Sequence, residues 1–342
     1  MKSARVFFSF VVLLDTSFAL IAFSKTKLYD ESDFAVPAVT IHTGGNLIYV
    51  SVPAASAAIT KNIMLHDFLH DEISLYDISK LAKGTEKGYY EVDSDIQQVK
   101  ILNMNPGYLT APIALWVVPA SFAHTTAKVI DVSNLNITRD SVEMITVMGA
   151  EPYTLRSITE GPMRVYAIMA GQDSLDVDAY TCAHVIEQMD LTSSSDFHAR
   201  VQSPLLTIYY ADYLGSKTSI RADLGIENSL DFSGISFVTS PGFNGCKGQP
   251  NTFYSSLYDP TTSCTYSSPT RPYDVAISSV LYTDSAHPVT VTDNTNGEMY
   301  GWYGTTPGPN LTMHQTNSIG ISWTRNDNNP LQSFLVRLIP SN

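Results

Sequence analysis

Short runs in which apolar side chains alternate with polar ones recur along most of the chain. The clearest are rich in Val, Ile, Tyr and Phe and are separated by clusters of Gly, Pro, Asn and Ser. They read NLIYVSV at 46–52, VKILNM at 99–104, IALWVV at 113–118, MRVYAIMA at 163–170, LLTIYYA at 205–211, VAISSVLYT at 275–283, VTVTD at 289–293, SIGISW at 318–323 and FLVRLI at 334–339. Alternation with a period of two is typical of strands with one buried face, so each run is predicted to be a β-strand.

Helical periodicity is scarce. The segment DEISLYDISKLAKG at 71–84 is expected to hold a helical turn, and AYTCAHVIEQMD at 179–190 is expected to form a short helix. Many short strands separated by turn residues favour sandwiches or barrels. The predicted fold is therefore all-β, built from antiparallel, jelly-roll-like sandwich modules in tandem.

An internal correspondence suggests how the chain divides. Residues 51–77 align without a gap with residues 267–293, and IALWVVPAS at 113–121 resembles FLVRLIPSN at 334–342. Few identities support this alignment, and chance similarity between β-rich stretches is the alternative. A repeat predicts β-sandwich modules at 26–121 and 232–342, joined by a divergent β module at 122–231.

The amino terminus has the features of a secretory signal. Two basic residues, Lys2 and Arg5, precede an apolar run at 6–14 that is too short to span a bilayer. Small residues favour cleavage after Ala19, giving a signal peptide at 1–19, or cleavage after Ser24. The alternative is an uncleaved anchor, although Asp15 interrupts the apolar stretch. We therefore expect a secreted, extracellular protein.

Charge and cysteine content narrow the partners further. The chain has 20 basic and 33 acidic residues among 342, and no run of Lys and Arg of the kind that binds phosphate backbones, so nucleic acid is not an expected partner. Cys246 and Cys264 lie 18 positions apart, and a disulfide between them would contribute about 3 kcal/mol on the chain-entropy model. Cys182 is then either buried and reduced or paired with another chain. In a secreted chain, Asn136 and Asn310 are predicted glycosylation sites.

The stretch HDFLHDE at 66–72 raises the possibility of a metal site. Two histidines four residues apart share one face of a helix, but here they lie between two alternating apolar runs, where a hairpin must reverse. We expect a solvated loop tip and predict no metal site and no cofactor. Calcium at loop carboxylates such as Asp284 and Asp293 stays open, with ordinary turn hydrogen bonds as the alternative.

No catalytic residues are predicted. The chain contains no GxSxG motif, P-loop or dinucleotide fingerprint. Cys182 lies near His184 in the sequence, but a buried structural thiol is the favoured interpretation of Cys182. Aromatic side chains are a better indication of function, because YGWYG at 300–304 places Tyr300, Trp302 and Tyr303 among glycines that suit a binding loop. The alternative is packing of these aromatic side chains across a strand pair.

The last third resembles the CUB-like domain of secreted nematode proteins, a divergent relative of the CUB β-sandwich. The residues that carry the resemblance are SPGFNGC at 240–246, the following Cys264, SSPTRPYDVAISSV at 267–280, PVTVTDNTNG at 288–297 and the closing SIGISW and FLVRLI runs. The acidic trio of calcium-binding CUB domains has no residue-by-residue match, and the usual second disulfide is absent. The resemblance implies a non-enzymatic secreted module, and nematode members are associated with responses to microbes and with membrane-raft fractions.

Together these observations predict a binding protein that is not an enzyme. Its expected ligand is a glycan or a protein surface in innate immune defence, with peripheral membrane-raft association as a further expectation. The oligomeric state is not predicted. The alternatives are a secreted hydrolase acting on glycans, which needs carboxylates or a nucleophile converging in a cleft, and a structural, capsid-like β protein.

Overall fold

The chain folds into several mostly antiparallel sheets with few helices, which confirms the predicted all-β class. The computed structural model describes residues 19–23, 39–40, 45–66, 72–84, 86–93, 98–103, 113–120, 128–139, 143–150, 153–160, 164–170, 184–188, 197–201, 205–211, 217–224, 229–231, 235–240, 243, 253–254, 261–304, 308–324 and 332–341.

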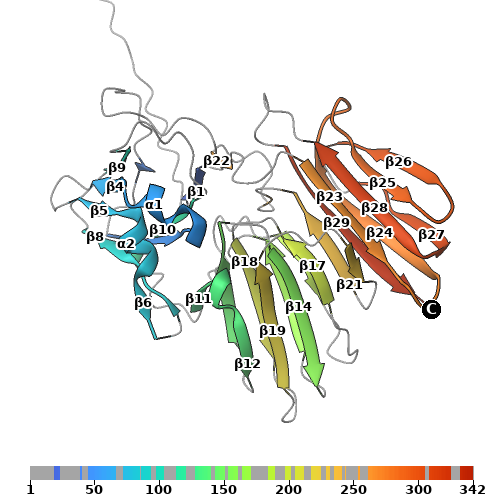
Figure 1. Cartoon of the computed structure of the whole chain (residues 1–342), viewed down its shortest axis with the longest axis horizontal. Helices are drawn as coiled ribbons and strands as arrows, with labels where there is room; N and C mark the ends of the chain where they lie inside the picture. Colours follow the sequence, from blue (N-terminus) through green and yellow to red (C-terminus); the bar gives the residue numbers. More distant parts are fainter. Residues whose placement is uncertain are drawn as a thin grey trace, which may run out of the picture.

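One eight-stranded sheet, here called the long sheet, runs through the second and last thirds of the chain (Figure 1). In spatial order its strands are β12 (Asn136–Arg139), β19 (Lys217–Leu224), β14 (Tyr153–Glu160), β17 (Phe197–Val201), β21 (Ile235–Thr239), β29 (Ser333–Ser341), β24 (Tyr273–Tyr282) and β27 (Leu311–Thr316). The parallel pair β17–β21 joins the two halves. The long sheet therefore crosses the boundary predicted near Asp231, and the division into modules stays a prediction.

Two five-stranded sheets cover opposite faces of the long sheet. The middle sheet contains β11 (Lys128–Asp131), β13 (Glu143–Met148), β18 (Leu205–Ala211), β15 (Arg164–Ala170) and β16 (His184–Gln188). The last sheet contains β20 (Ser229–Asp231), β23 (Thr261–Ser267), β28 (Ser318–Thr324), β25 (Val289–Asp293) and β26 (Glu298–Trp302).

Neighbouring residues of β21 show that the two covering sheets lie on different faces. Phe237 packs in a cluster with Ile145 of the middle sheet, whereas Val238 packs in a cluster with Ile321 of the last sheet. Successive side chains of a strand point to opposite faces. The central strands of the long sheet are therefore covered on both sides.

The first third of the chain, together with Phe253–Tyr254 from the last third, forms a further pair of sheets. One sheet contains β22 (Phe253–Tyr254), β1 (Ala19–Phe23), β10 (Ile113–Pro119), β3 (Asn46–Ser51) and β8 (Tyr90–Val92), and the other contains β2 (Val39–Thr40), β9 (Gln98–Asn103), β4 (Ile63–His66) and β5 (Ile73–Ser74). The remaining elements are the ribbon β6 (Ala82–Lys83) and β7 (Glu86–Lys87), the helices α1 (Ala57–Thr60) and α2 (Leu75–Lys80), and the 3-10 helices η1 (Ala54–Ser56) and η3 (Val132–Asn134).

An apolar cluster joins this first third to the middle sheet. Tyr49 and Trp116 pack with Val129, Met148 and Leu205, and all five side chains are buried. The ring centroids of Tyr49 and Trp116 are 5.3 Å apart. Aromatic burial of this kind favours a fixed contact between the two regions.

Most local expectations are confirmed. All of the alternating runs quoted above form strands, and the helical turn expected within 71–84 is α2. The Ser74 hydroxyl accepts a hydrogen bond from the Asp77 backbone amide over 3.0 Å, which caps the start of α2. The short helix expected within 179–190 is wrong where the structure describes it, because residues 184–188 form β16 and pair with β15. That pairing outweighs a weak helical pattern.

The proposed alignment of 51–77 with 267–293 is not matched by the local structures. α1 and α2 occupy positions that align with strands β24 and β25. Strands β4 and β5 pair as the expected hairpin, whereas β24 and β25 belong to different sheets. The capped start of α2 explains part of this difference, because a helix begins where the alignment places a strand.

The amino-terminal strand bears on the expected cleavage. Ala19–Phe23 form β1, which pairs with β10 so that Ala22 lies opposite Ala114. Cleavage after Ala19 keeps residues 20–23 of this strand, whereas cleavage after Ser24 removes it. Residues 1–18 lie outside the described part of the chain, so the signal peptide stays a prediction.

Candidate functional site

The outer face of the last sheet is covered by small hydroxyl side chains. In one row across the sheet, Ser263 of β23 lies opposite Ser322 of β28, and Ser322 lies opposite Thr290 of β25. In the next row, Thr265 and Thr292 flank Gly320. Their strand neighbours, such as Tyr266, Val291 and Ile321, point inward and are buried. This face therefore presents hydroxyl groups that both donate and accept hydrogen bonds.

A groove of about 390 Å³ opens on this face, at one end of the rows. Its lining residues are Thr262, Ser263, Ala286, His287, Pro288, Thr290, Ser322, Trp323 and Thr324. Its volume lies at the lower end of the range of small-ligand sites, and its polar groups are mostly hydroxyls.

One wall of the groove is held by a network around Asp284. The Asp284 carboxylate accepts hydrogen bonds from the backbone amides of Ala286 (3.0 Å) and His287 (2.9 Å), and it lies 3.0 Å from His287 Nδ1. Gln332 donates to the other carboxylate oxygen. Trp323 Nε1 donates to the His287 carbonyl over 3.1 Å. These contacts fix the position of His287, so the wall is formed without a ligand.

The predicted aromatic residues do not all lie on a loop. Tyr300 and Trp302 belong to strand β26, and Trp302 is 6% exposed and packs in the core of the last sheet. Tyr300 packs against the same core and donates a hydrogen bond from its hydroxyl to Glu298 over 2.7 Å. Tyr303 follows β26 and is 59% exposed. Trp302 therefore packs in the core, as the alternative to a binding loop expects, whereas the Tyr303 side chain is exposed to solvent.

Tyr303 stands near the groove because of the strand register. Trp302 lies opposite Val289, and Pro288, which lines the groove, directly precedes Val289. Gly304 then forms an isolated antiparallel bridge with Thr283. A binding role for Tyr300, Trp302 and Tyr303 stays a prediction. Of the three, only Tyr303 is exposed and follows a residue paired beside the groove-lining Pro288.

The predicted disulfide and glycosylation sites stay predictions. Cys264 is a free, buried thiol in the structure, and its predicted partner Cys246 lies outside the described residues, as does Cys182. Burial raises the pKa of the Cys264 thiol to about 12, although the nearby Arg200 opposes this shift. Asn136 lies in β12, and Asn310 is exposed just before β27.

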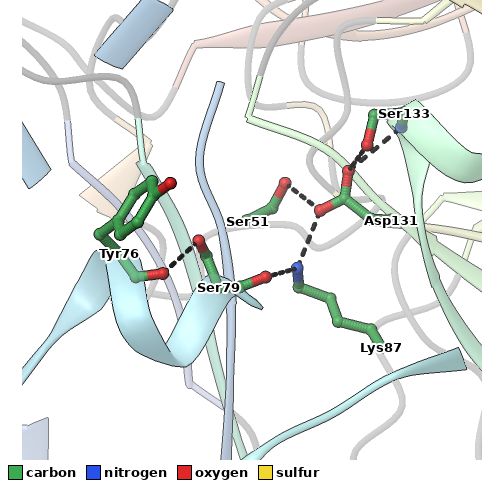
Figure 2. A network of polar contacts seen from close by, with 6 residues as sticks. All are labelled: Ser51, Tyr76, Ser79, Lys87, Asp131 and Ser133. Atoms are coloured by element: carbon green, nitrogen blue, oxygen red, sulfur yellow. Dashed lines mark hydrogen bonds and ion pairs between the residues drawn. The ribbon is translucent and has the colours of Figure 1, made fainter. Parts of the chain in front are cut away.

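A buried polar network joins the first third to the middle sheet (Figure 2). Lys87 Nζ lies 2.8 Å from Asp131 Oδ2, and it also donates to the Ser79 carbonyl over 3.3 Å. The Ser51 hydroxyl donates to Asp131 Oδ2, and the Ser133 hydroxyl and amide donate to Oδ1. The carboxylate thus has several donors, as a buried charge requires.

The network shifts the pKa values of both charged groups. Burial lowers the pKa of Lys87, and the attraction of Asp131 opposes that shift. For Asp131, burial acts to raise the pKa, but the Lys87 charge and the hydrogen bonds from Lys87, Ser133 and Ser51 outweigh it, so the pKa is lowered. The pair is buried against other side chains and lines no described groove, so we assign it to structure rather than to ligand binding.

The histidine and aspartate residues considered above as metal ligands contact neighbouring groups of the chain. His66 ends β4 and lies 3.9 Å from Glu72, while residues 67–71 fall outside the described part. The Asp293 carboxylate accepts from the amides of Thr295 and Asn296 in its own turn, as Asp284 does in its turn. Among the described residues, no group of three or more His, Cys, Asp and Glu side chains is arranged to hold a metal ion. Within the same residues, no helix is long and apolar enough to cross a membrane.

The groove residues were not singled out by sequence reasoning. A signal was present, because Ser or Thr occupies alternate positions in TTSCTYS at 261–267 and in VTVTD at 289–293. That pattern gives the composition of an exposed strand face. It does not give the order of strands that brings Ser263, Ser322 and Thr290 into one row.

Comparison with known proteins adds little. No family model and no curated protein matches the chain. Among solved structures, it is similar to the CUB1-EGF-CUB2 domains of rat MASP-1, at 8% identity over 62% of this chain and 99% of that one, with a TM-score of 0.20. It is also similar to a Sulfolobus Turreted Icosahedral Virus structure (10% identity, 95% and 89% covered, TM-score 0.16) and to a Bacillus thuringiensis Cry1Da tryptic core variant (9%, 90% and 53%, 0.19). At these TM-scores the likenesses carry no argument, and the nematode CUB-like family stays a prediction.

Proposed function

We propose that this chain is a secreted, non-enzymatic binding protein that recognises a glycan through the groove on the last sheet. The observation that carries the proposal is the row Ser263–Ser322–Thr290, whose three residues line a groove of about 390 Å³. Sugars present many hydroxyl groups, and side-chain hydroxyls can donate to them or accept from them without a large change in charge.

The groove offers further groups that suit a sugar. His287 supplies an imidazole held in place by Asp284, and the exposed Tyr303 supplies an aromatic face near the rim. Aromatic rings combine a large apolar face with a polar tip, which suits the mixed surface of a sugar ring. Secretion is supported by the amino-terminal sequence pattern, and a role in defence against microbes, with membrane-raft association, rests on the CUB-like resemblance.

Binding to a glycan array and to fixed microbes tests the proposal, using wild-type protein and a variant with a blocked groove. Ser322→Arg places a long side chain in the centre of the row. Ala276→Arg adds the same charge at an exposed position of β24 on the long sheet and serves as the matched control. We expect wild type and Ala276→Arg to bind the same glycans and Ser322→Arg to lose them. Unchanged glycan binding by Ser322→Arg contradicts the proposal that the glycan binds in the groove. Binding to proteins but to no glycan contradicts the proposal that the ligand is a glycan.

A further inference from the structure

Two rows of polar side chains, some buried and some partly exposed, cross strands β17, β14 and β19 of the long sheet. On β14, Tyr153 and Leu155 point into the apolar core, so Thr154 and Arg156 point to the opposite face. Thr154 lies opposite Arg200 of β17 and opposite Asp223 of β19. Arg156 lies opposite Arg221 of β19. These positions form two adjacent rows, here called the arginine face.

The arginine face has an excess of positive charge. Among the side chains that the structure describes there, three are arginines (Arg156, Arg200 and Arg221) and one is acidic (Asp223). Asp223 Oδ2 lies 3.3 Å from Arg156 Nε and 3.9 Å from Arg221 Nε, so one carboxylate is shared by two guanidinium groups. Like charges directly opposite each other on a sheet are unfavourable, and this arrangement occurs in a chain with a net charge of −13.

Two buried polar atoms in the same rows have no hydrogen-bond partner among the described residues: Thr154 Oγ1 and Arg200 Nε. Thr154 is fully buried, and Arg200 is 3% exposed. Arg200 uses Nη1 to donate to the Ser263 carbonyl, and its side chain also contacts the Cys264 thiol, so Nε is the atom of its guanidinium group that lacks a partner within the described part of the chain. Buried polar groups are nearly always paired with protein, water or an ion, so two unpaired donors side by side indicate a missing acceptor.

We propose that the arginine face binds an oxyanion, a sulfate, phosphate or carboxylate group. Such a group accepts hydrogen bonds from Thr154 Oγ1 and Arg200 Nε and compensates the excess charge of Arg156 and Arg221. Guanidinium groups suit this ligand because their planar, fixed donors match pairs of oxyanion oxygens. None of these four side chains lines the groove, although Arg200 donates to the backbone carbonyl of Ser263, which does. The proposal does not depend on glycan recognition.

Isothermal titration calorimetry and thermal unfolding with sodium sulfate, sodium phosphate and sodium acetate test the proposal, against sodium chloride at matched ionic strength. The variants are Arg221→Gln and Thr154→Val, which keeps the shape of the side chain but removes the unpaired hydroxyl. Arg271→Gln is the matched control, because it removes the same charge from an exposed position in the last third of the chain. A charge-assisted hydrogen bond corresponds to roughly a tenfold or larger change in affinity.

We expect saturable binding of at least one oxyanion to wild type and to Arg271→Gln, and at least about tenfold weaker binding to Arg221→Gln. Thr154→Val should melt no lower than wild type in chloride, yet gain less from the oxyanion. A response to sulfate and phosphate alone assigns a tetrahedral ligand, and an equal response to acetate assigns a carboxylate. The absence of saturable binding to wild type overturns the proposal. Equal stabilisation of all four proteins also overturns it, because sulfate and phosphate stabilise folded proteins generally.

Discussion

Lys87 Nζ lies 2.8 Å from Asp131 Oδ2, and the two residues are 44 positions apart in the sequence. Lys87 belongs to the small ribbon of the first third, and Asp131 ends the edge strand β11 of the middle sheet. The Lys87 side chain is only 2% exposed. This ion pair, with the apolar cluster around Trp116, therefore joins two regions that local sequence patterns present as separate modules.

Removing one partner of this pair should destabilise the fold strongly. Lys87→Met leaves a buried carboxylate without its cation, and Asp131→Asn leaves a buried ammonium group, so each should cost about 3–5 kcal/mol in the free energy of unfolding. The double variant should cost less than the sum of the two, because no unpaired charge remains. Urea unfolding measures all three. Lys80→Met, at an exposed position on α2, should cost less than about 1 kcal/mol. Additive single effects would contradict direct coupling of the pair.

The same pair predicts a pH dependence at the acid end. The pKa of Asp131 is lower in the folded protein than its ordinary value of 3.8, so the unfolded chain binds this proton more tightly. The stability contributed by Asp131 is therefore complete above about pH 4 and is lost as the pH falls through the folded pKa. Urea unfolding of wild type and Asp131→Asn should show a constant difference from pH 7 to 5 and a smaller one at pH 3. A difference that grows toward acid pH contradicts the lowered pKa.

Cys264 should not react with thiol reagents in the native protein. Its side chain is buried, and burial raises its pKa to about 12, so little thiolate forms at neutral pH. Iodoacetamide labelling followed by peptide mass spectrometry should find Cys264 unmodified in the native protein and modified once denaturant and reductant are added. Rapid native labelling at Cys264 would be inconsistent with this burial. Labelling in denaturant without reductant also tests the predicted Cys246–Cys264 bridge, which leaves one of the three cysteines reactive.

The two neighbouring aromatic residues Trp302 and Tyr303 should behave differently. Trp302→Ala removes a buried side chain and should cost about 3–5 kcal/mol in the free energy of unfolding. Tyr303→Ala removes an exposed side chain and should leave stability nearly unchanged while weakening glycan binding about tenfold. Urea unfolding and binding on the same array separate the two effects. Equal losses of stability would show that Tyr303 is packed rather than exposed.

The sequence predicts the strands better than it predicts their partners. Alternation of Val275, Ile277 and Leu281 is a local signal, and it correctly indicates β24. No local pattern indicates that β17 and β21 pair in parallel, because alternation within a strand does not identify the strand that lies beside it in the sheet. The long sheet was therefore not predicted, although most of its strands are visible in the pattern.

The two elements that were predicted wrongly, residues 184–188 and the loop around Trp302, are both determined by strand pairing. Residues 184–188 have a mixed pattern, and their pairing with β15 decides in favour of a strand. Trp302 lies in a glycine-rich aromatic run that resembles a binding loop, but its position opposite Val289 directs its side chain into the core. The groove and the arginine face both depend on which strands are neighbours, which local periodicity does not contain.

Threonine-methyl NMR tests most directly whether the glycan lies in the groove. Wild-type protein with labelled threonine methyl groups is titrated with the glycan that it binds most strongly on the array. Thr290 and Thr324 line the groove, so their methyl signals should shift, whereas the signals of Thr146 and Thr207, a buried pair in the middle sheet, should stay in place. Saturable shifts at other threonines, with Thr290 and Thr324 unchanged, would contradict a ligand on the last sheet.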